Sequence, residues 1–333
     1  MKLLITGGAG FIGVRLARTL LARGTLAGAA IEQIVLADLV SPPPELLADA
    51  RVRPRIGALR AQCDALAHER FDAVFHLASA VSAECEADFD LGLASNLDTT
   101  RALLDALRRA GNTPRLVFAS SVAVYGSDPA LPLPPVVRDD TLPTPQSSYG
   151  IHKFICEQLI ADYTRRGFID GRSVRLMTVA VRPGRPNAAA SSFVSDIIRE
   201  PLAGLDAVCP VAGDTELAVA SPARTIEGLI VACEAERDAF GGRTALNLPA
   251  LTVRVHDMLA ALEAVAGSAA RERVRFAPDA AIERIVGGWP ARFEPGRSLR
   301  LGLQPDPDFR SIVLQYIAEH PASPASTTSR RHA

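Results

Sequence analysis

Short runs of consecutive apolar residues alternate with segments of helical spacing through the first half of the chain. The strand candidates cover residues 2–6, 34–37, 53–56, 73–77, 115–119 and 173–181, and helices are expected after Gly13, over 60–69 and 93–110, and from Tyr149. Continuous apolar runs of this length are typical of parallel strands that helices cover on both faces. The pattern therefore predicts an α/β fold with a Rossmann-type doubly wound parallel sheet.

The second half of the chain is expected to form mostly a smaller C-terminal lobe, over residues 181–320. Within it, residues 244–250 predict a last strand that returns to the main sheet, and residues 256–267 predict an amphipathic helix. Residues 279–308 are expected to pack in the lobe. The polar, low-complexity residues 321–333 predict a disordered tail.

A glycine-rich turn joins the first strand to the first helix and carries the first chemical signal. Its residues fit both G-x-G-x-x-G and G-x-x-G-x-x-G; the candidate ligand-binding positions are Gly7, Gly10, Phe11, Ile12 and Gly13. Glycines let the backbone approach a pyrophosphate at a helix N-terminus, where free N–H groups favour anions. The strand–turn–helix context favours a dinucleotide cofactor over a tight turn that binds nothing.

Asp38 closes the second strand and bears on which dinucleotide is bound. A carboxylate there would accept a hydrogen bond from the ribose 2′-hydroxyl of NAD and repel the 2′-phosphate of NADP. No Arg or Lys follows until Arg51. We therefore expect residues 1–180 to form a NAD-binding domain, although Asp38 is open to a second interpretation as an ordinary strand-ending residue.

The end of the 73–77 strand is expected to line the cofactor groove, through Leu77, Ala78 and Ser79. Asn96 lies near the start of the next helix, where it either caps that helix or bonds the cofactor or neighbouring loops. His76 lies inside an apolar strand, which favours a packed histidine over a catalytic one.

Tyr149 and Lys153 are four residues apart in the segment SSYGIHKFICE, so a helix places them on one face. A Lys ammonium beside a phenol favours the phenolate, which is a general base for a hydroxyl proton. Ser121 follows a buried strand, at the edge where ligands bind in open α/β sheets. The structural alternatives are a surface Tyr and Lys and a turn serine. The proline-rich loop 128–146 precedes the helix, and its length suggests function.

Composition excludes several other classes of protein. The 333 residues are 48% apolar with a net charge of −1, so a large core is available and nucleic-acid binding has no electrostatic basis. The five cysteines are widely spaced and form no pattern typical of a disulfide framework or a metal site. The N-terminus resembles neither a signal peptide nor a membrane span, so we expect a cytoplasmic protein that does not contact membranes.

Six motifs in order make the chain resemble the extended short-chain dehydrogenase/reductase family, which includes nucleotide-sugar epimerases. They are TGGAGFIG, Asp38, VFHLAS, Asn96, SSVAVYG and YGIHK, and the resemblance covers residues 1–260. It implies that Tyr149 is the general base, that Lys153 holds the nicotinamide ribose and lowers the Tyr149 pKa, and that Ser121 positions the substrate oxygen. One departure is Gly57-Ala58, where the family usually carries Gly-Asp near the adenine.

Further segments resemble one branch of that family, whose members oxidise the C2 hydroxyl of the sugar acid D-erythronate with NAD. These segments are QSSYG, RRGFIDG, VRPGRPNAAASSF, IIREPLAG and SPART. Thr178 stands where nucleotide-sugar enzymes usually carry Asn.

A sugar acid presents a carboxylate, which a guanidinium grips with two hydrogen bonds. The candidate substrate residues are Arg182, Arg185 and Arg224 for the carboxylate and Asn187, Ser191 and Ser192 for hydroxyls, with Arg224 the first choice. Surface ion pairs are the alternative for each arginine.

The expected partner is therefore a small sugar acid, with NAD as cofactor and no metal. Two rival hypotheses remain: a nucleotide-sugar 4-epimerase or dehydratase on the same fold, and a non-catalytic NAD-binding protein. The low aromatic content of 5% weighs against a platform for a nucleotide base. The resemblance also implies a homodimer formed through the helices around 95–110 and 149–166.

Overall fold

A seven-stranded parallel sheet forms the centre of the larger part of the molecule. The computed structural model describes residues 1–184 and 189–321. The strand order is β13-β9-β7-β6-β1-β4-β5, with bounds β1 Lys2–Thr6, β4 Gln33–Asp38, β5 Val52–Ile56, β6 Ala73–His76, β7 Arg115–Ser121, β9 Asp170–Leu176 and β13 Leu246–Asn247. The chain winds outward in both directions from β1 and β6, which confirms the predicted doubly wound sheet.

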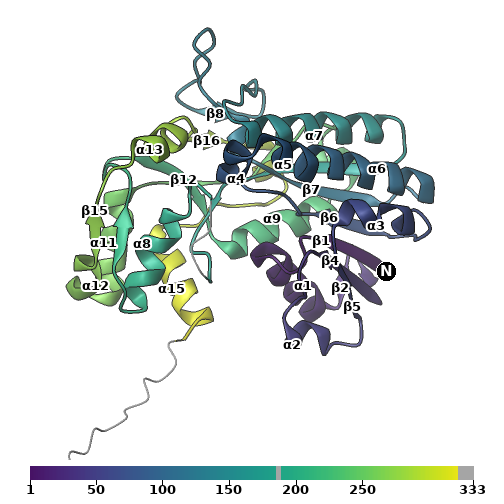
Figure 1. Cartoon of the computed structure of the whole chain (residues 1–333), viewed down its shortest axis with the longest axis horizontal. Helices are drawn as coiled ribbons and strands as arrows, with labels where there is room; N and C mark the ends of the chain where they lie inside the picture. Colours follow the sequence, from purple (N-terminus) through teal and green to yellow (C-terminus); the bar gives the residue numbers. More distant parts are fainter. Residues whose placement is uncertain (185–188, 322–333) are drawn as a thin grey trace, which may run out of the picture.

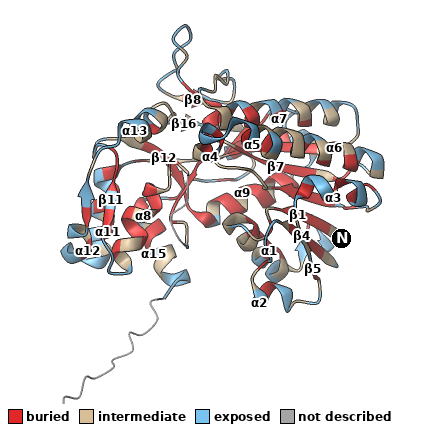
Figure 2. Cartoon of the chain, viewed as in Figure 1, coloured by how far each residue is buried: buried red, intermediate tan, exposed pale blue. Residues whose placement is uncertain are grey.

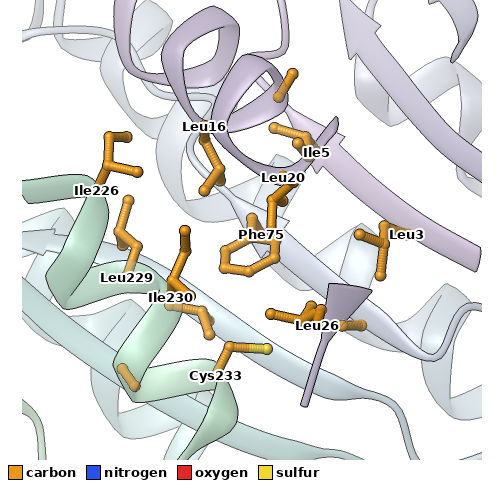
Figure 3. Packing of buried hydrophobic residues seen from close by; sticks show 14 of the residues in the cluster. Leu3, Ile5, Leu16, Leu20, Leu26, Phe75, Ile226, Leu229, Ile230 and Cys233 are labelled. Carbon is orange, nitrogen blue, oxygen red and sulfur yellow. The ribbon is translucent and has the colours of Figure 1, made fainter. Parts of the chain in front are cut away.

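Helices cover both faces of this sheet (Figure 1). One face carries α1 (Phe11–Arg23) and α9 (Pro222–Glu234), which bury Leu16 and Leu229 against Phe75 of the sheet (Figure 3). The other face carries α3 (Leu59–Leu66), α6 (Thr99–Ala110) and α7 (Ser148–Arg165). Burying each large apolar side chain contributes about 1.5–3 kcal/mol, so the apolar strands predicted from the sequence are stabilised from both sides.

Shorter elements connect the main ones. They are β2 Thr25–Leu26, β3 Ala29–Ala30, α2 Pro44–Leu47, α4 Ser82–Ala87, α5 Phe89–Gly92, a π-helical turn Leu93–Asp98, a 3₁₀ turn Val122–Val124, β8 Val137–Arg138 and α10 Arg237–Phe240. Within the loop expected over 128–146, β8 pairs in parallel with β16 (Phe293–Glu294).

A smaller lobe lies beside the large sheet and has its own core (Figure 2). Its elements are α8 Phe193–Leu202, α11 Val255–Ala266, α12 Ser268–Glu272, α13 Ala280–Gly287, α15 Phe309–Glu319 and the pair β11 Ala207–Cys209 and β15 Val274–Phe276. A three-stranded sheet of β10 (Thr178–Val179), β12 (Glu216–Ala220) and β14 (Leu251–Arg254) also contributes to it.

Two expectations about the second half need correction. The run 173–181 is not one strand, because β9 ends at Leu176 in the large sheet and β10 pairs with β12 in the smaller one. Residues 279–308 do not all pack in the lobe, since Leu303, which follows α14 (Gly296–Arg300), is buried in the core beneath the large sheet. The return of 244–250 to the sheet is confirmed by the parallel pairing of β13 with β9.

The expected tail falls outside the described residues from 322 onward. Among the helices within 1–184 and 189–321, none is long and apolar enough to cross a membrane. The five cysteines are all buried and unpaired.

Candidate active site

A cavity of about 690 Å³ opens at the carboxyl ends of the central strands. It reaches from the glycine turn to the smaller lobe. The sequence-predicted residues that line it are Gly7, Gly10, Phe11, Ile12, Gly13, Asp38, Leu77, Ala78, Ser79, Ser121, Tyr149, Lys153, Arg182 and Ser191. Fourteen candidates that are scattered over residues 7–191 therefore meet in one place.

The glycine turn at one end of the cavity has no room for side chains. Gly7 has φ +69°, a left-handed conformation that favours glycine. A Cβ on Gly13 would overlap the Gly7 carbonyl oxygen and lie 2.8 Å from the Gly8 Cα. No described side chain caps α1 at Gly10, so the N–H groups of its first turn face the cavity. This cradle fits a pyrophosphate.

Asp38 is fixed beside the turn. One carboxylate oxygen accepts a hydrogen bond from the backbone N–H of Ala9 at 2.9 Å, and the other accepts from Leu39 at 2.7 Å. This negative charge at the end of β4 fits the ribose hydroxyls of NAD and repels a 2′-phosphate. Beyond it, Ala58 and Arg60 line the cavity where the family usually has a carboxylate; Arg60 was not predicted.

Asn96 does not line the cavity, and its side chain bonds the neighbouring loop. Its Oδ1 accepts from the Ala80 N–H at 2.7 Å and from the Ser79 hydroxyl at 2.9 Å, and it lies in the π-helical turn. Asn96 thus holds Ser79 at the cavity wall.

His76 is packed, as expected. Its ring nitrogens bond the hydroxyls of Thr6 at 2.7 Å and Thr100 at 2.9 Å, and burial lowers its pKa to about 3. The ring therefore stays neutral and joins β1, β6 and α6 behind the glycine turn.

Close contact between α7 and the end of β7 brings Tyr149 to Ser121. Ser147 caps α7 by accepting from the Gly150 N–H at 3.2 Å. A Cβ on Gly150 would overlap the Ala123 carbonyl oxygen, so only glycine allows this approach. The Ser121 hydroxyl also accepts from the Ala123 N–H at 3.1 Å, which fixes its position.

Lys153 lies one helical turn beyond Tyr149 and is almost completely buried. Its Nζ donates to the Ala119 carbonyl oxygen at 2.8 Å and lies 5.5 Å from the centre of the Tyr149 ring. Burial lowers the Lys153 pKa to about 8, while the charge of Glu157 opposes this shift. The ammonium is thus held at the junction of the cofactor and substrate ends.

Burial raises the pKa of Tyr149 to about 12, while a hydrogen bond to Ser121 and the charge of Arg182 act in the opposite direction. The expected lowering by Lys153 is therefore not observed in this structure. The reason is geometric, because the Lys153 ammonium bonds the Ala119 carbonyl and does not lie against the phenol oxygen.

A buried ion pair that the sequence did not reveal supports this edge. Glu157 Oε2 lies 2.7 Å from Arg175 Nη2, and the Ser120 hydroxyl donates to Glu157 Oε1 at 2.5 Å. Arg175 also donates to the Tyr125 hydroxyl at 2.5 Å. The sequence signal for Glu157 was its position four residues after Lys153, which places the two side chains on the same face of the helix.

Arg182 enters the cavity from the smaller lobe. Its guanidinium donates to the Ser191 carbonyl and hydroxyl, both at 3.0 Å, and burial lowers its pKa. Within residues 1–184 and 189–321 Arg182 forms no ion pair, and the Asp196 carboxylate whose charge acts on it pairs instead with Arg199 at 2.6 Å. The positive charge is thus available to an anionic ligand beside Tyr149.

Other substrate candidates do not reach the cavity. Arg224 pairs with Glu227 at 2.7 Å on α9 and is absent from the cavity lining. Ser192 donates to Asp196 at 3.3 Å. Arg185 and Asn187 lie outside the described residues. Conversely, Trp289 lines the cavity although no sequence pattern indicated it.

Comparison with known proteins agrees with this geometry. The sequence profile of the NAD dependent epimerase/dehydratase family matches residues 3–217. Two relatives named D-erythronate dehydrogenase are 50% identical over 96% of this chain and 98% of the relative (Cupriavidus necator) and 43% identical over 95% and 99% (Haemophilus influenzae).

Solved structures share the fold. One described as a nucleoside-diphosphate-sugar epimerase from Agrobacterium tumefaciens has a TM-score of 0.89 at 40% identity, covering 96% of this chain and 94% of its own. An L-threonine dehydrogenase from Cupriavidus necator superposes with a TM-score of 0.82 at 21% identity, covering 96% of this chain and 99% of its own. The chain, with its glycine turn, Asp38 and the Ser121, Tyr149 and Lys153 cluster, belongs to the NAD-dependent epimerase/dehydratase family.

Proposed function

We propose that this protein is a dehydrogenase that oxidises the C2 hydroxyl of D-erythronate with NAD, giving 2-dehydro-D-erythronate. The observation that carries the proposal is the Arg182 guanidinium, which lies in the cavity with Tyr149 and, among the described residues, donates to the Ser191 hydroxyl and carbonyl. The two relatives named for this activity match nearly the whole chain.

Arg182 would hold the substrate carboxylate with two hydrogen bonds, and Ser191 would keep the guanidinium in place. This grip sets the C2 hydroxyl against Tyr149 and Ser121, since C2 is adjacent to the carboxylate. Part of the binding free energy is thereby used to hold the C2 hydroxyl in the orientation that the reaction requires. The proposal assigns the carboxylate to Arg182, where the sequence had favoured Arg224.

Tyr149 would act as a phenolate and take the C2 hydroxyl proton, while Ser121 donates a hydrogen bond to the oxygen as it becomes a carbonyl. The hydrogen bond to Ser121 and the positive charge of Arg182 favour the phenolate against the effect of burial. NAD, when held by the glycine turn, Asp38 and Lys153, supplies the hydride acceptor.

We also propose a homodimer, with α7 at the interface as the family resemblance implies and with α5 beside it in place of the expected helix over 95–110. Three large apolar side chains on these helices are exposed and do not line the cavity: Phe89 61%, Ile151 44% and Ile155 38%. Ile151 and Ile155 are one turn apart and so share a face of α7. Covering such a face favours association, and light scattering of the purified chain tests it.

The test of the activity is NADH formation by the purified protein with NAD. The panel is D-erythronate, L-erythronate, D- and L-threonate, and UDP-glucose. NADH with D-erythronate alone would support the proposal, whereas no NADH with any acid would refute it.

A nucleotide-sugar epimerase is the second candidate, because the related Agrobacterium tumefaciens structure carries that description. Consumption of UDP-glucose without net NADH would support it. NAD binding without any reaction would favour the non-catalytic alternative, which leaves the Ser121, Tyr149 and Lys153 cluster without a purpose.

A further inference from the structure

Trp289 forms part of the substrate end of the cavity, and the mechanism above assigns it no role. It is the one tryptophan in the sequence and follows α13 directly. Its side chain is half-buried, packs against the core of the smaller lobe, and lines the cavity with Val122 and Thr178. An indole at this place presents a large apolar wall to a ligand.

A second cavity, of only about 10 Å³, adjoins this wall. Val122, Thr178 and Trp289 line both cavities, so these three side chains stand between them. The small cavity is otherwise enclosed by residues of β12 and α13 and by Pro290. Removing the indole would join the two spaces and lengthen the substrate end toward Glu216 of β12.

The wall is fixed in place by its own segment. The backbone N–H of Trp289 donates to the Val286 carbonyl at 3.1 Å. Arg292 donates two hydrogen bonds to Glu216, at 3.1 and 2.7 Å, and its carbonyl accepts from Val137 at 2.9 Å. The segment therefore joins α13 to the β16–β8 pair (Figure 1). Anchors on both sides make the indole a preorganised wall.

From this geometry we infer that Trp289 sets the chain-length limit of the substrate and excludes sugar acids longer than four carbons. The inference rests on the proposed function. Arg182 and Tyr149 would fix the first two carbons, so the wall that meets the remaining carbons decides how many fit. An apolar wall also leaves additional hydroxyls without hydrogen-bond partners, which penalises longer acids.

The test compares kcat/KM of the wild type and Trp289→Ala for D-erythronate, D-ribonate and D-allonate, which share the C2 and C3 configuration. The expected result is that the preference for D-erythronate over D-ribonate falls about tenfold or more in the variant, the scale of one carbon in a shaped pocket. Trp289→Leu serves as a second variant that keeps more of the lobe's packing.

Phe293→Ala is the matched control, because Phe293 belongs to the same segment but packs against Tyr125 and does not line the cavity. Its preference ratio should equal that of the wild type even if its melting temperature falls. An active wild type whose ratio is unchanged by both Trp289 substitutions would overturn this inference alone. A wild type that oxidises none of the three acids would overturn the proposed function, and the inference with it.

Fluorescence supplies a readout that does not depend on turnover. All indole emission comes from Trp289, since the sequence has no other tryptophan. In the Tyr149→Phe variant with NAD bound, D-erythronate should shift or quench this emission. Saturable binding without any change in emission would place the acid away from Trp289 and contradict the inference.

Discussion

The cofactor end of the cavity is formed mainly by backbone, whereas the substrate end is formed by side chains. At the cofactor end, a turn of backbone between β1 and α1 forms the pyrophosphate cradle, and Asp38, at the end of the neighbouring strand β4, lies beside it. At the substrate end, side chains converge from β7, α7, the segment after β10, and the segment after α13. One end depends on the absence of side chains and the other on their exact chemistry.

This difference suggests how the family varies its substrates. The backbone cradle serves any member that binds NAD, and its geometry tolerates little change because glycine contacts are already close. Arg182 and Trp289 come from the smaller lobe, whose core is separate from that of the large sheet. Replacing them can alter substrate choice without disturbing the cofactor site.

The largest expected effect is on turnover, and it distinguishes the chemical step from the binding of NAD and of the substrate. Tyr149→Phe removes the proton acceptor and keeps the ring, so turnover should fall about 10³-fold, within the usual range for a general base. NAD affinity should stay within about twofold by isothermal calorimetry, since the cradle is untouched. Near-full activity in this variant would remove Tyr149 from the mechanism.

Gly13→Ala tests the backbone cradle. The new Cβ would overlap the Gly7 carbonyl oxygen, and overpacking of this kind costs about 1–3 kcal/mol. NAD affinity should therefore fall about 10- to 100-fold. Gly10→Ala is the graded control, because its Cβ would lie 3.2 Å from the same oxygen. Equal affinities for the two variants would show that the cradle tolerates side chains.

Arg182→Met tests the substrate end. A charge-assisted hydrogen bond contributes about 1.5–3 kcal/mol, so the KM for D-erythronate should rise about 10- to 100-fold while NAD affinity is unchanged. Arg224→Met is the matched control, since Arg224 pairs with Glu227 outside the cavity. If Arg224→Met raised KM and Arg182→Met did not, the carboxylate would have to be reassigned.

The smallest expected effect concerns Lys153, where the two ends meet. The pKa of Lys153 is about 8 in the folded protein, below the ordinary value of 10.5. Between pH 8 and 10.5 the unfolded chain therefore binds more protons than the folded protein. The destabilising effect of burying Lys153 decreases as the pH rises through this range. We expect the stability of the wild type relative to Lys153→Met to increase by about 2 kcal/mol from pH 8 to 9.5. Urea unfolding of both proteins measures this difference at each pH. The buried cysteines are present in both proteins, so the contribution of their titration cancels in the difference. A gap that is constant with pH would contradict the lowered pKa.

The sequence predicted the cofactor end well because that end depends on local rules. A glycine turn between a strand and a helix and an acid at a strand end each keep their meaning without knowledge of the whole fold, and so does the Tyr–Lys pair four residues apart, where the two ends meet. The substrate end depends on how segments that are distant in sequence come together in the fold. The sequence favoured Arg224 over Arg182 for the carboxylate, whereas the path of the chain after β10 brings Arg182 to the cavity and leaves Arg224 outside it.

Two other differences have the same origin. The apolar run 173–181 does not reveal that its hydrogen-bond partner changes from β7 to β12 at residue 177. The Tyr149 pKa depends on burial and on the direction of the Lys153 ammonium, and spacing along a helix specifies neither.

The most direct test of the central claim follows the hydrogen on C2. The purified protein would be given NAD and D-erythronate carrying deuterium at C2, and the NADH formed would be examined by mass spectrometry. We expect one deuterium in each NADH and slower turnover than with unlabelled substrate. NADH without deuterium would place the oxidation at another carbon and contradict the placement of the carboxylate on Arg182 and the C2 hydroxyl at Tyr149.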